Sequence, residues 1–342
     1  MSSLYEKDFH QTDISNLSFL ITGGAGFIGS NIVEYLVQHG AGKIRILDNL
    51  SEGKRENIEP FLSLDSVEFV EADISDFQTC KDACKGMDYV DHQAALGSVP
   101  RSIATPTITN NANVTGFLNM ITAAKDAGVK RFVYASSSSV YGDHPTLPKV
   151  EANIGNPLSP YAVTKYVNEL YSSVFGVNYG FETVGLRYFN VFGPRQKPDG
   201  PYAAVIPLFM DALIKGEAPK INGDGEQSRD FTFVVNAVEA NIRGMFSKVE
   251  GATGKVYNIA FGERRTINQL FDILKSLSGS DIEAIYRDSR PGDVRHSLAD
   301  ISQATKLLGY QPEYDIDRGL DITFDWFKTC LLYTSPSPRD RG

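Results

Sequence analysis

The sequence predicts an α/β fold in which a doubly wound parallel sheet is joined to a smaller α/β lobe. Three observations lead to this prediction. Short apolar runs alternate with stretches of helical length over residues 17–190, and this alternation is typical of a parallel sheet with helices on both faces. A glycine-rich turn joins the first apolar run to the first helical stretch. After residue 190 prolines become frequent and the alternation is lost, which indicates a second lobe.

The composition is that of an ordinary soluble protein. The chain has 342 residues, of which 42% are apolar and 22% are charged, so it exceeds one typical domain. No apolar run approaches the roughly 18 residues that span a bilayer, and residues 1–16 lack the apolar segment of a signal peptide. The net charge of −9 argues against nucleic acid or anionic membranes as partners. We therefore expect a cytoplasmic protein without a membrane or nucleic-acid partner.

The cysteines and histidines predict neither a disulfide framework nor a metal site. There are three cysteines, an odd count, and we expect Cys80 and Cys84 to be buried, inert thiols. The five histidines are scattered along the sequence; they are His10, His39, His92, His144 and His296. We therefore predict no bound metal.

A glycine-rich loop follows the first predicted strand. Leu17–Ile21 is a short apolar run that indicates a buried strand, and Thr22–Ser30 leads from it into a predicted helix over Asn31–Gln38. Three glycines of this loop are spaced three apart: Gly23, Gly26 and Gly29. Such glycines permit a tight turn and let backbone N–H groups approach a pyrophosphate at the helix N-terminus. The alternative is a glycine-rich turn that binds no ligand.

The second predicted strand, Lys43–Leu47, ends in an acidic residue, Asp48. It lies about 20 residues beyond the glycines, where a carboxylate can accept hydrogen bonds from both hydroxyls of an adenosine ribose. The same carboxylate would repel a 2′-phosphate, so it favours NAD over NADP. Asn49 and Ser51 follow in the same loop. The glycine loop and Asp48 together predict an NAD site of the Rossmann type.

Polar or small residues follow several of the later predicted strands. These strands are Val67–Glu71, Tyr89–His92, Arg131–Ala135 and Glu182–Arg187. The residues that follow the first three are Asp73 and Ile74, Gln93 to Ala95, and the four serines 136–139. Open α/β sheets bind their ligands at the carboxyl ends of the strands, so we expect these residues near NAD. Asp73 could instead cap the next helix. A further helix is predicted over Asn113–Lys125.

A second helix start carries a candidate acid–base pair. Ser159 is a favourable N-cap, and Pro160 suits the first position of a helix that we expect to reach about Phe175. Tyr161 and Lys165 are four residues apart and share one face of this helix. A nearby ammonium and a helix N-terminus both favour a phenolate, so we expect Lys165 to lower the pKa of Tyr161. The alternative is an ordinary surface tyrosine and lysine.

The loss of the strand–helix alternation after residue 190 sets the predicted domain boundaries. Residues 17–190 and about 232–261 are predicted to form the NAD-binding domain. Residues 191–231 and 262–330 are predicted to form the substrate lobe. Residues 331–342 carry little helix or strand signal, and we predict a disordered or non-native tail.

The motifs resemble those of the extended short-chain dehydrogenase/reductase family over residues 17–328. They occur in the family's order: Thr22–Gly29, Asp73-Ile74, the serines before Val140–Gly142, Tyr161–Lys165 and Arg187–Pro194. The resemblance implies NAD(P) as the cofactor, a catalytic serine, tyrosine and lysine, and a nucleotide-sugar bound by the second lobe. This chain departs from the pattern at Gln93, where the family has an asparagine.

The resemblance also implies a homodimer. Family members commonly pair through the tyrosine helix and the helix near residues 113–127. The tyrosine helix carries four apolar residues that either serve this interface or face the core: Val163, Val167, Leu170 and Val174.

Within the family, the serine run favours 4-epimerisation. Dehydratases carry an Asp-Glu pair, and decarboxylases usually a Glu, where this chain has Ser138 and Ser139; a serine cannot replace a carboxylate acid or base. Epimerases restricted to plain hexoses carry a bulky tyrosine at the position of Ser297, so a serine leaves room for a 2-N-acetyl group. Residues 141–168 and 222–231 resemble UDP-N-acetylglucosamine 4-epimerases of surface-polysaccharide synthesis. The resemblance therefore implies interconversion of UDP-N-acetylglucosamine and UDP-N-acetylgalactosamine through a 4-keto intermediate.

Several alternatives stay open. The same reaction could act on UDP-N-acetylglucosaminuronate or on UDP-glucose. The protein could be a nucleotide-sugar dehydratase or decarboxylase. A non-catalytic NAD-binding regulator on the same fold is a further alternative, although such proteins usually lack the tyrosine or the lysine.

The resemblance assigns a role to each candidate site residue. The catalytic residues are Ser137, Tyr161 and Lys165. The cofactor-binding residues are Gly23, Gly26, Phe27, Ile28, Gly29, Asp48, Asn49, Ser51, Asp73, Ile74, Gln93, Ala94, Ala95, Asn113, Tyr161, Lys165, Tyr188 and Val191. The substrate-binding residues are Gly97, Ser98, Ser137, Ser138, Tyr161, Asn190, Ala204, Val205, Asn222, Arg229, Arg290, Asp293 and Ser297.

Overall fold

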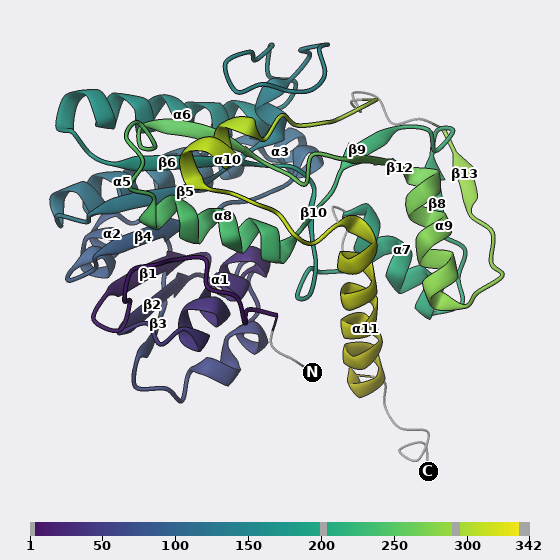
Figure 1. Ribbon diagram of the computed structural model, residues 1–342, viewed down its shortest axis with the longest axis horizontal. Helices are drawn as coiled ribbons and strands as arrows, with labels where there is room; N and C mark the ends of the chain where they lie inside the picture. The colour runs from purple at the N-terminus through teal and green to yellow at the C-terminus, as the bar shows by residue number, and fades with distance from the viewer. Residues whose placement is uncertain (1–3, 199–203, 289–294, 335–342) are drawn as a thin grey trace.

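A computed structural model of the protein describes residues 4–198, 204–288 and 295–334, with side chains described up to residue 329. Within these residues the central sheet has seven strands (Figure 1), and every neighbouring pair is parallel. From edge to edge they are β3 (Val67–Glu71), β2 (Lys43–Asp48), β1 (Ser18–Thr22), β4 (Tyr89–His92), β5 (Arg131–Ser137), β6 (Thr183–Tyr188) and β11 (Lys255–Ile259). The strand order reverses between β1 and β4, which opens a crevice at the carboxyl ends of the strands. The predicted doubly wound α/β fold is confirmed.

Both faces of the sheet are buried, because successive side chains of a strand point to opposite faces. On β1, Phe19 and Ile21 belong to one hydrophobic core and Leu20 belongs to a second. All three side chains are fully buried. This explains why the strands appear in the sequence as continuous apolar runs rather than as alternating patterns.

Two layers of helices cover the sheet (Figure 1). Helices α1 (Phe27–Gln38) and α8 (Val234–Phe246) pack together and contribute to the core that contains Phe19. Helices α2 (Phe77–Cys84), α5 (Gly116–Asp126) and α6 (Pro160–Tyr179) contribute to the core that contains Leu20. The tyrosine helix α6 contacts β5 and β6, so the sheet holds its first turn near the crevice.

Two helices begin at positions that differ from the prediction. Helix α1 starts at Phe27, directly after the glycines, rather than at Asn31. The predicted helix over Asn113–Lys125 is part of a longer helical stretch. Its segments are α3 (Val99–Ala104), α4 (Pro106–Asn110), a π-helical turn (Asn111–Thr115) and α5. Apolar periodicity reveals only the part of a helix that packs on a core. It therefore predicted neither the start of α1 directly after the glycines nor the π-helical turn before α5.

The remaining elements lie mainly beyond β6 in the chain. Two short parallel strands, β7 (Val191–Phe192) and β10 (Thr232–Phe233), pair with each other. The others are α7 (Val205–Ile214), β8 (Lys220–Asn222), β9 (Ser228–Asp230), β12 (Arg264–Thr266), α9 (Ile267–Ser278), β13 (Ile285–Arg287), α10 (Ser302–Leu308) and α11 (Ile316–Thr334). Three 3₁₀ turns complete the described structure: η1 (Arg55–Asn57), η2 (Glu59–Phe61) and η4 (Ser138–Tyr141).

In Figure 1 the elements α7, β8, α9 and β13 gather at one end of the molecule, away from β1 to β3. The exact division into two domains stays a prediction. Residues 331–334 form the end of α11, and the rest of the predicted tail lies outside the described residues.

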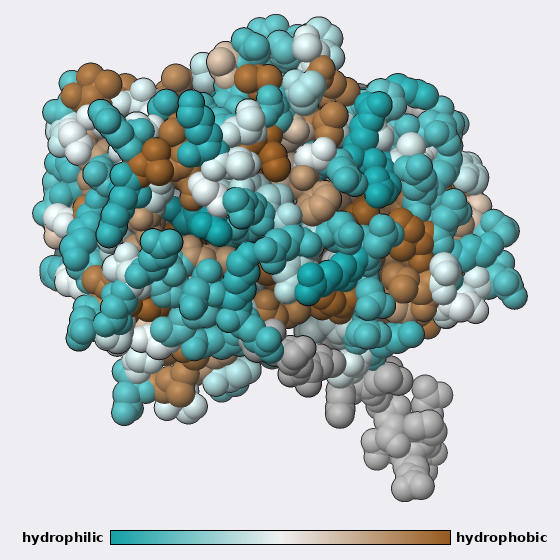
Figure 2. Space-filling view, in the orientation of Figure 1, coloured by the Kyte–Doolittle hydropathy of each residue, from teal (hydrophilic) through white to brown (hydrophobic). Residues whose placement is uncertain are grey.

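Polar side chains predominate on the face shown in Figure 2, where hydrophobic residues form small separate groups. Among the residues that the structure describes, no helix has the length and apolar character needed to cross a membrane. The predicted buried cysteines are confirmed for Cys80 and Cys84, and burial raises the pKa of each thiol to about 12.

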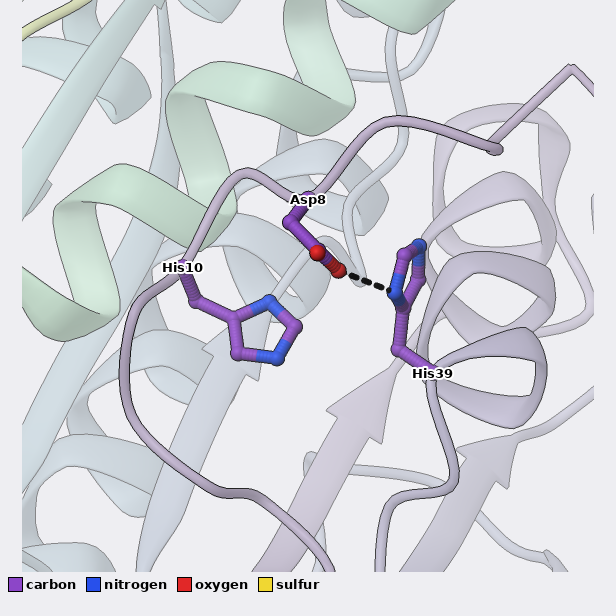
Figure 3. Close-up of side chains that lie close together, drawn as sticks. All are labelled: Asp8, His10 and His39. Atoms are coloured by element: carbon purple, nitrogen blue, oxygen red, sulfur yellow. Dashed lines mark ion pairs between the residues drawn. The ribbon is translucent and has the colours of Figure 1, made fainter.

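The prediction that the histidines are scattered is wrong for two of them. His10 and His39 lie side by side with Asp8 at the C-terminal end of α1 (Figure 3). Their positions are 29 residues apart in sequence, and only the packing of the N-terminal segment on α1 brings them together.

Candidate active site

A cavity of about 640 Å³ opens at the carboxyl ends of the central strands. Most of the predicted cofactor-binding residues line it: Gly23, Gly26, Phe27, Ile28, Gly29, Asp48, Asn49, Ser51, Asp73, Ile74, Gln93, Ala94, Ala95, Tyr161, Lys165 and Tyr188. Asn113 and Val191 are not among the lining residues. The structure therefore brings together residues that are up to 165 positions apart in the sequence, because the strand ends, the loops after them and the start of α6 meet at one edge of the sheet.

Two glycines of the loop have no room for a side chain. Gly23 has a φ of +66°, and a Cβ on it would lie 2.7 Å from the backbone nitrogen of Ala94. A Cβ on Gly29 would lie 2.3 Å from the carbonyl oxygen of Gly23. Gly26 is the N-cap of α1 and gives no side-chain cap, and the first turn carries no acidic residue. The helix N-terminus therefore faces the cavity with its N–H groups available to an anion.

Two backbone N–H groups hold the carboxylate of Asp48 in place. One carboxylate oxygen accepts the backbone N–H of Leu50 at 2.8 Å, and the other accepts the N–H of Ala25 at 3.0 Å. Burial raises the pKa of Asp48, and these two hydrogen bonds act in the opposite direction. Lys197 also lowers this pKa through its charge, so a cation lies near the carboxylate. The carboxyl group thus stands at the end of β2 with one edge held by the glycine loop.

Asp73 lies one strand further along, and it does not cap α2, whose N-cap is Asp76. Its oxygens accept the N–H of Ser75 at 2.7 Å and the side-chain amide of Asn49 at 2.8 Å. Burial alone would raise the pKa of Asp73, but these hydrogen bonds lower it below its usual value. The predicted alternative, an Asp73 that caps the next helix, is therefore wrong.

The three predicted catalytic residues come together at the start of α6 and the end of β5. The side chain of Ser137 lies near enough to the hydroxyl of Tyr161 to lower its pKa. Ser159 caps the helix, because its hydroxyl accepts the N–H of Ala162 at 3.1 Å. Lys165 is buried, and its Nζ donates to the carbonyl oxygen of Ala135 at 2.8 Å. Tyr161 and Lys165 both line the cavity, whereas Ser137 is not among its lining residues.

The expectation that Lys165 lowers the pKa of Tyr161 is not met. Burial raises the pKa of Tyr161, and the opposing influence is the side chain of Ser137. The reason is geometric: Nζ of Lys165 points to β5 and lies 6.0 Å from the centroid of the tyrosine ring. Burial also lowers the pKa of Lys165 to about 8, which Glu169 partly offsets.

Glu169 is a residue that the sequence analysis missed. It lies one helical turn beyond Lys165 and is buried with Arg187, which binds both of its oxygens, at 2.9 and 2.7 Å. Ser136 of the cavity wall donates its hydroxyl to the same carboxylate at 2.5 Å. The signal that could have found it is the spacing of four from Tyr161 to Lys165 to Glu169, which puts all three on one helix face.

Gln93, the departure from the family pattern, belongs to a buried polar network behind the cavity. Its amide nitrogen lies 2.6 Å from an oxygen of Asp91 and 3.0 Å from both the Tyr188 hydroxyl and Asn241 Oδ1. The other oxygen of Asp91 is buried and has no hydrogen-bond partner among the described residues. Burial raises the pKa of Asp91 to about 7. Gln93 and Tyr188 are thus held from behind while they face the cavity.

Asn113 supports the site without lining the cavity. In the π-helical turn its side-chain oxygen accepts the N–H of Leu96 at 2.8 Å, and its amide donates to the carbonyl of Leu96 at 3.2 Å and to the Thr164 hydroxyl at 3.1 Å. It therefore ties the loop after β4 to the tyrosine helix.

The predicted substrate residues are only partly brought to the cavity. Gly97, Tyr161 and Ala204 line it. The described ones that do not are Ser98, Ser137, Ser138, Asn190, Val205, Asn222, Arg229 and Ser297. Arg229 and Ser297 nevertheless lie close together, since the N–H of Ser297 donates to the carbonyl of Ser228 at 3.0 Å. Arg290 and Asp293 lie outside the described residues.

The cavity also contains basic residues that no motif indicated. They are Arg101, Arg195 and Lys197. Arg101 pairs with Glu52 at 2.6 Å across the cavity edge. Arg195 pairs with Glu34 of α1 and has a φ of +71°, so the loop after β7 is tied to the first helix. Arg195 and Lys197 lie in a loop and Arg101 lies in the short helix α3. Isolated basic residues such as these carry no spacing signal, which is why the sequence alone did not single them out.

The comparisons with known proteins agree with this site. The profile of the NAD dependent epimerase/dehydratase family matches residues 19–260. A UDP-glucose 4-epimerase of Mycolicibacterium smegmatis is 36% identical over 311 residues, covering 90% of this chain and 98% of the relative.

Two solved structures are similar in sequence and in fold. One is a UDP-N-acetylglucosamine 4-epimerase from Methanobrevibacter ruminantium in complex with UDP-N-acetylmuramic acid, with 43% identity, a TM-score of 0.86 and coverage of 92% of this chain and 98% of that one. The other is a UDP-glucose 4-epimerase from Thermus thermophilus in complex with NAD, with 34% identity, a TM-score of 0.81 and coverage of 91% and 99%.

The chain therefore belongs to the NAD dependent epimerase/dehydratase family. It is an enzyme of the epimerase type that uses NAD. The site fits this cofactor, because the N-terminus of α1 reaches the cavity without an acidic residue in its first turn and the carboxylate of Asp48 lines the same cavity at the end of β2.

Proposed function

We propose that the protein interconverts UDP-N-acetylglucosamine and UDP-N-acetylgalactosamine by reversible oxidation at C4 of the sugar. The observation that carries the proposal is that Tyr161 lines the NAD cavity beside Lys165, with the Ser137 side chain close enough to influence its hydroxyl. A hydroxyl in this position can exchange a proton with a substrate alcohol. NAD, when bound, supplies the oxidation and re-reduction of that carbon.

In the proposed reaction, Tyr161 acts as a phenolate, which the positive charge of bound NAD⁺ would favour against the effect of burial. It takes the proton of the 4-hydroxyl, directly or through Ser137, and later returns it. Lys165 holds the nicotinamide ribose and keeps a positive charge in the site at neutral pH, since burial lowers its pKa only to about 8. Between the two proton transfers the 4-keto sugar turns over, so the sugar must be held loosely and the diphosphate firmly. We assign the UDP to Arg229, Arg290 and Asp293, with the two arginines on its diphosphate, because the guanidinium fork suits a diphosphate.

The serine run supports epimerisation over dehydration and decarboxylation. Ser138 and Ser139 form the first turn of η4, directly after β5. The hydroxyl of Ser139 is buried and has no partner within the described part of the chain. Neither side chain can act as the carboxylate acid or base that those reactions use.

The sugar is proposed from Ser297 and from the relatives. A serine leaves more room than a tyrosine, and the relative with 43% identity is named for UDP-N-acetylglucosamine. UDP-glucose is the second candidate, because the relatives from Mycolicibacterium smegmatis and Thermus thermophilus are named for that sugar.

The proposal is tested by incubating the purified protein separately with UDP-N-acetylglucosamine, its uronic-acid form and UDP-glucose, and by identifying the products by NMR. We expect UDP-N-acetylglucosamine to give UDP-N-acetylgalactosamine with unchanged mass and no net NADH. Loss of water or CO₂, or NADH in proportion to product, would overturn epimerisation. Conversion of UDP-glucose alone would replace the proposed substrate by the second candidate.

A matched variant tests the assigned base. Tyr161→Phe removes only the hydroxyl, and we expect turnover to fall at least about 100-fold, the usual contribution of a positioned acid or base. Circular dichroism and bound NAD should be unchanged. Appreciable residual epimerisation by Tyr161→Phe would remove Tyr161 from this role.

We further propose that the enzyme works in the cytoplasm as a homodimer and supplies sugars for surface polysaccharide. The support for the dimer is the outer face of α6, where Val163, Leu170 and Val174 are 48%, 49% and 51% exposed. The alternative that these three residues face the core is therefore wrong.

A further inference from the structure

A second cluster of side chains that can bind a cation lies at the far end of α1 from the cavity. Asp8, His10 and His39 each offer one ligand atom, and these atoms lie within 4.8 Å of one another. In Figure 3 the carboxylate of Asp8 and the two imidazole rings converge on one shared space. An oxygen of Asp8 lies 2.8 Å from Nδ1 of His39.

The hydrogen bond made by Nε2 of His39 shows that Nδ1 is the ring nitrogen with a free lone pair. Nε2 of His39 lies 2.8 Å from the carbonyl oxygen of Tyr5. A carbonyl only accepts, so Nε2 must carry a proton and donate it. In the neutral imidazole, Nδ1 is then a bare lone pair that faces a carboxylate oxygen. Two acceptors at this distance need a cation between them, either a proton or a metal ion.

His10 is oriented in a similar way. Its Nδ1 lies 2.6 Å from the Tyr35 hydroxyl, which also accepts the N–H of Phe9 at 2.8 Å. A hydroxyl oxygen can accept two hydrogen bonds, so Nδ1 can donate here and leave Nε2 free for a ligand. A histidine that binds a metal usually donates its other N–H to a carbonyl or another acceptor, which fixes the ring. His39 has such an acceptor in the carbonyl of Tyr5, and the hydroxyl of Tyr35 is the candidate for this role at His10.

Packing holds the two rings in place. The ring of Tyr35 stacks on His39, with centroids 4.1 Å apart, and on Phe9, with centroids 5.2 Å apart. His10 meets His39 edge to face at 5.5 Å. Asp8 is 73% exposed in its side chain, so it can shift toward the histidines and leaves a position open for water.

The helix adds to the attraction for a cation. His39 is the C-cap of α1, and the last turn of this helix carries no basic residue. A helix C-terminus carries a partial negative charge that favours cations. We propose that Asp8, His10 and His39 bind a borderline divalent transition-metal ion such as Zn²⁺, with water completing the coordination.

The chemistry of the three ligands determines the class of ion. Imidazole and carboxylate together suit Zn²⁺ and its neighbours, whereas Mg²⁺ prefers a shell of oxygens. Ligand atoms around tetrahedral Zn²⁺ are roughly 3.3 Å apart. The Asp8–His39 separation of 2.8 Å would therefore open slightly, and ligand atoms that are up to 4.8 Å apart would move closer together; the exposed side chain of Asp8 can make this adjustment. A bound ion would clamp the N-terminal segment to α1.

The test is isothermal titration calorimetry of the untagged full-length protein, freed of metal with EDTA, with ZnCl₂ and separately with MgCl₂. We expect one Zn²⁺ per chain with a Kd in the micromolar range or tighter, and no binding of Mg²⁺. Asp8→Asn keeps the side-chain shape at an exposed position and should weaken Zn²⁺ binding at least 10-fold. His10→Gln should do the same, whereas His144→Gln, which alters a histidine elsewhere, should bind as the wild type does.

Thermal unfolding gives a second readout. Zn²⁺ should raise the Tm of the wild type and of His144→Gln, but not that of Asp8→Asn. Epimerase activity should be the same in all of them, because α1 of 12 residues places this cluster roughly 18 Å from the glycine loop. The proposal is overturned if the wild type binds no Zn²⁺ at 1 mM, or if Asp8→Asn binds it equally well. In either case a proton, shared in an ordinary ion pair, occupies the space between Asp8 and His39.

Discussion

Asp91 is a carboxyl group buried in the central strand β4, with one oxygen bonded to Gln93 and the other without a partner in the described structure. Burial raises its pKa to about 7, well above the ordinary value for an aspartate. Between pH 4 and pH 7 the folded protein therefore keeps a proton that the unfolded chain has lost. Asp91 therefore makes the folded state less stable as the pH rises through that range.

We predict that Asp91→Asn removes this dependence. The free energy of unfolding of the variant, relative to the wild type, should increase by about 2–3 kcal/mol between pH 5 and pH 8. Urea unfolding at both pH values, at one fixed NAD concentration, measures it. The comparison with the wild type cancels the other titrating groups, including Asp230, whose pKa burial also raises to about 7. A pH-independent difference between the two proteins would contradict the prediction.

Ser297 carries the prediction of sugar specificity. Its backbone N–H donates to the carbonyl of Ser228. This hydrogen bond holds Ser297 beside Arg229, the residue that we propose binds the diphosphate. We predict that Ser297→Tyr lowers kcat/KM for UDP-N-acetylglucosamine at least about 10-fold more than for UDP-galactose, because the larger ring fills the space for the N-acetyl group. Steady-state assays of both substrates measure this. Equal losses would remove Ser297 as the size filter.

At the scale of elements, a buried ion pair joins the tyrosine helix to its neighbouring strand. Glu169 of α6 and Arg187 of β6 are almost fully buried and bond through two hydrogen bonds. Arg187 also donates to the carbonyl of Glu151 at 3.0 Å. The pair therefore fixes the helix that carries Tyr161 and Lys165 against the sheet.

We predict that replacing either residue of the Glu169–Arg187 ion pair alone destabilises the folded state. Glu169→Gln and Arg187→Met should each lower the free energy of unfolding by about 3–5 kcal/mol, since each leaves a buried charge unpaired. The double variant should lose clearly less than the sum of the two, because it removes both charges of the pair together. Chemical denaturation of the four proteins measures the coupling. Strictly additive losses would show that the two groups act independently.

The strands and the glycine loop could be predicted because their signals are local. Each buried strand is a short apolar run, and Gly29 is required by a clash with the carbonyl oxygen of Gly23 in the same loop. The start of the tyrosine helix at Pro160 is likewise set by its own cap, Ser159. Such features depend on neighbours in sequence, so a single sequence contains them.

The features that were missed depend on tertiary packing. Lys165 turns toward the carbonyl of Ala135 on β5, so its effect on Tyr161 could not be judged from their spacing on the helix. Asp8 and His39 meet only because the N-terminal segment packs on α1. Glu169 is spaced so that it shares a helix face with Tyr161 and Lys165, but its role becomes visible only through its ion pair with Arg187 on β6.

At the scale of the molecule, the cavity is formed by segments from Gly23 to Ala204, so no single element contains the site. The glycine loop, the strand ends and the tyrosine helix each contribute a separate part. Arg195, tied to Glu34 of α1, links the loop that follows β7 to the first helix. The chemistry of the site therefore depends on the whole sheet being formed.

The exposed apolar face of α6 leads to the prediction at this scale. Val163, Leu170 and Val174 repeat at helical spacing on the helix whose opposite face carries Lys165 and Glu169. If this face pairs with a second copy, Leu170→Glu should convert the wild-type dimer to a monomer in size-exclusion chromatography with light scattering, because a charge would be buried at the interface. Val249→Glu is the matched control, since Val249 is equally exposed, at 49%, but lies in a turn away from α6. A monomeric wild type, or a dimeric Leu170→Glu, would refute pairing through this helix.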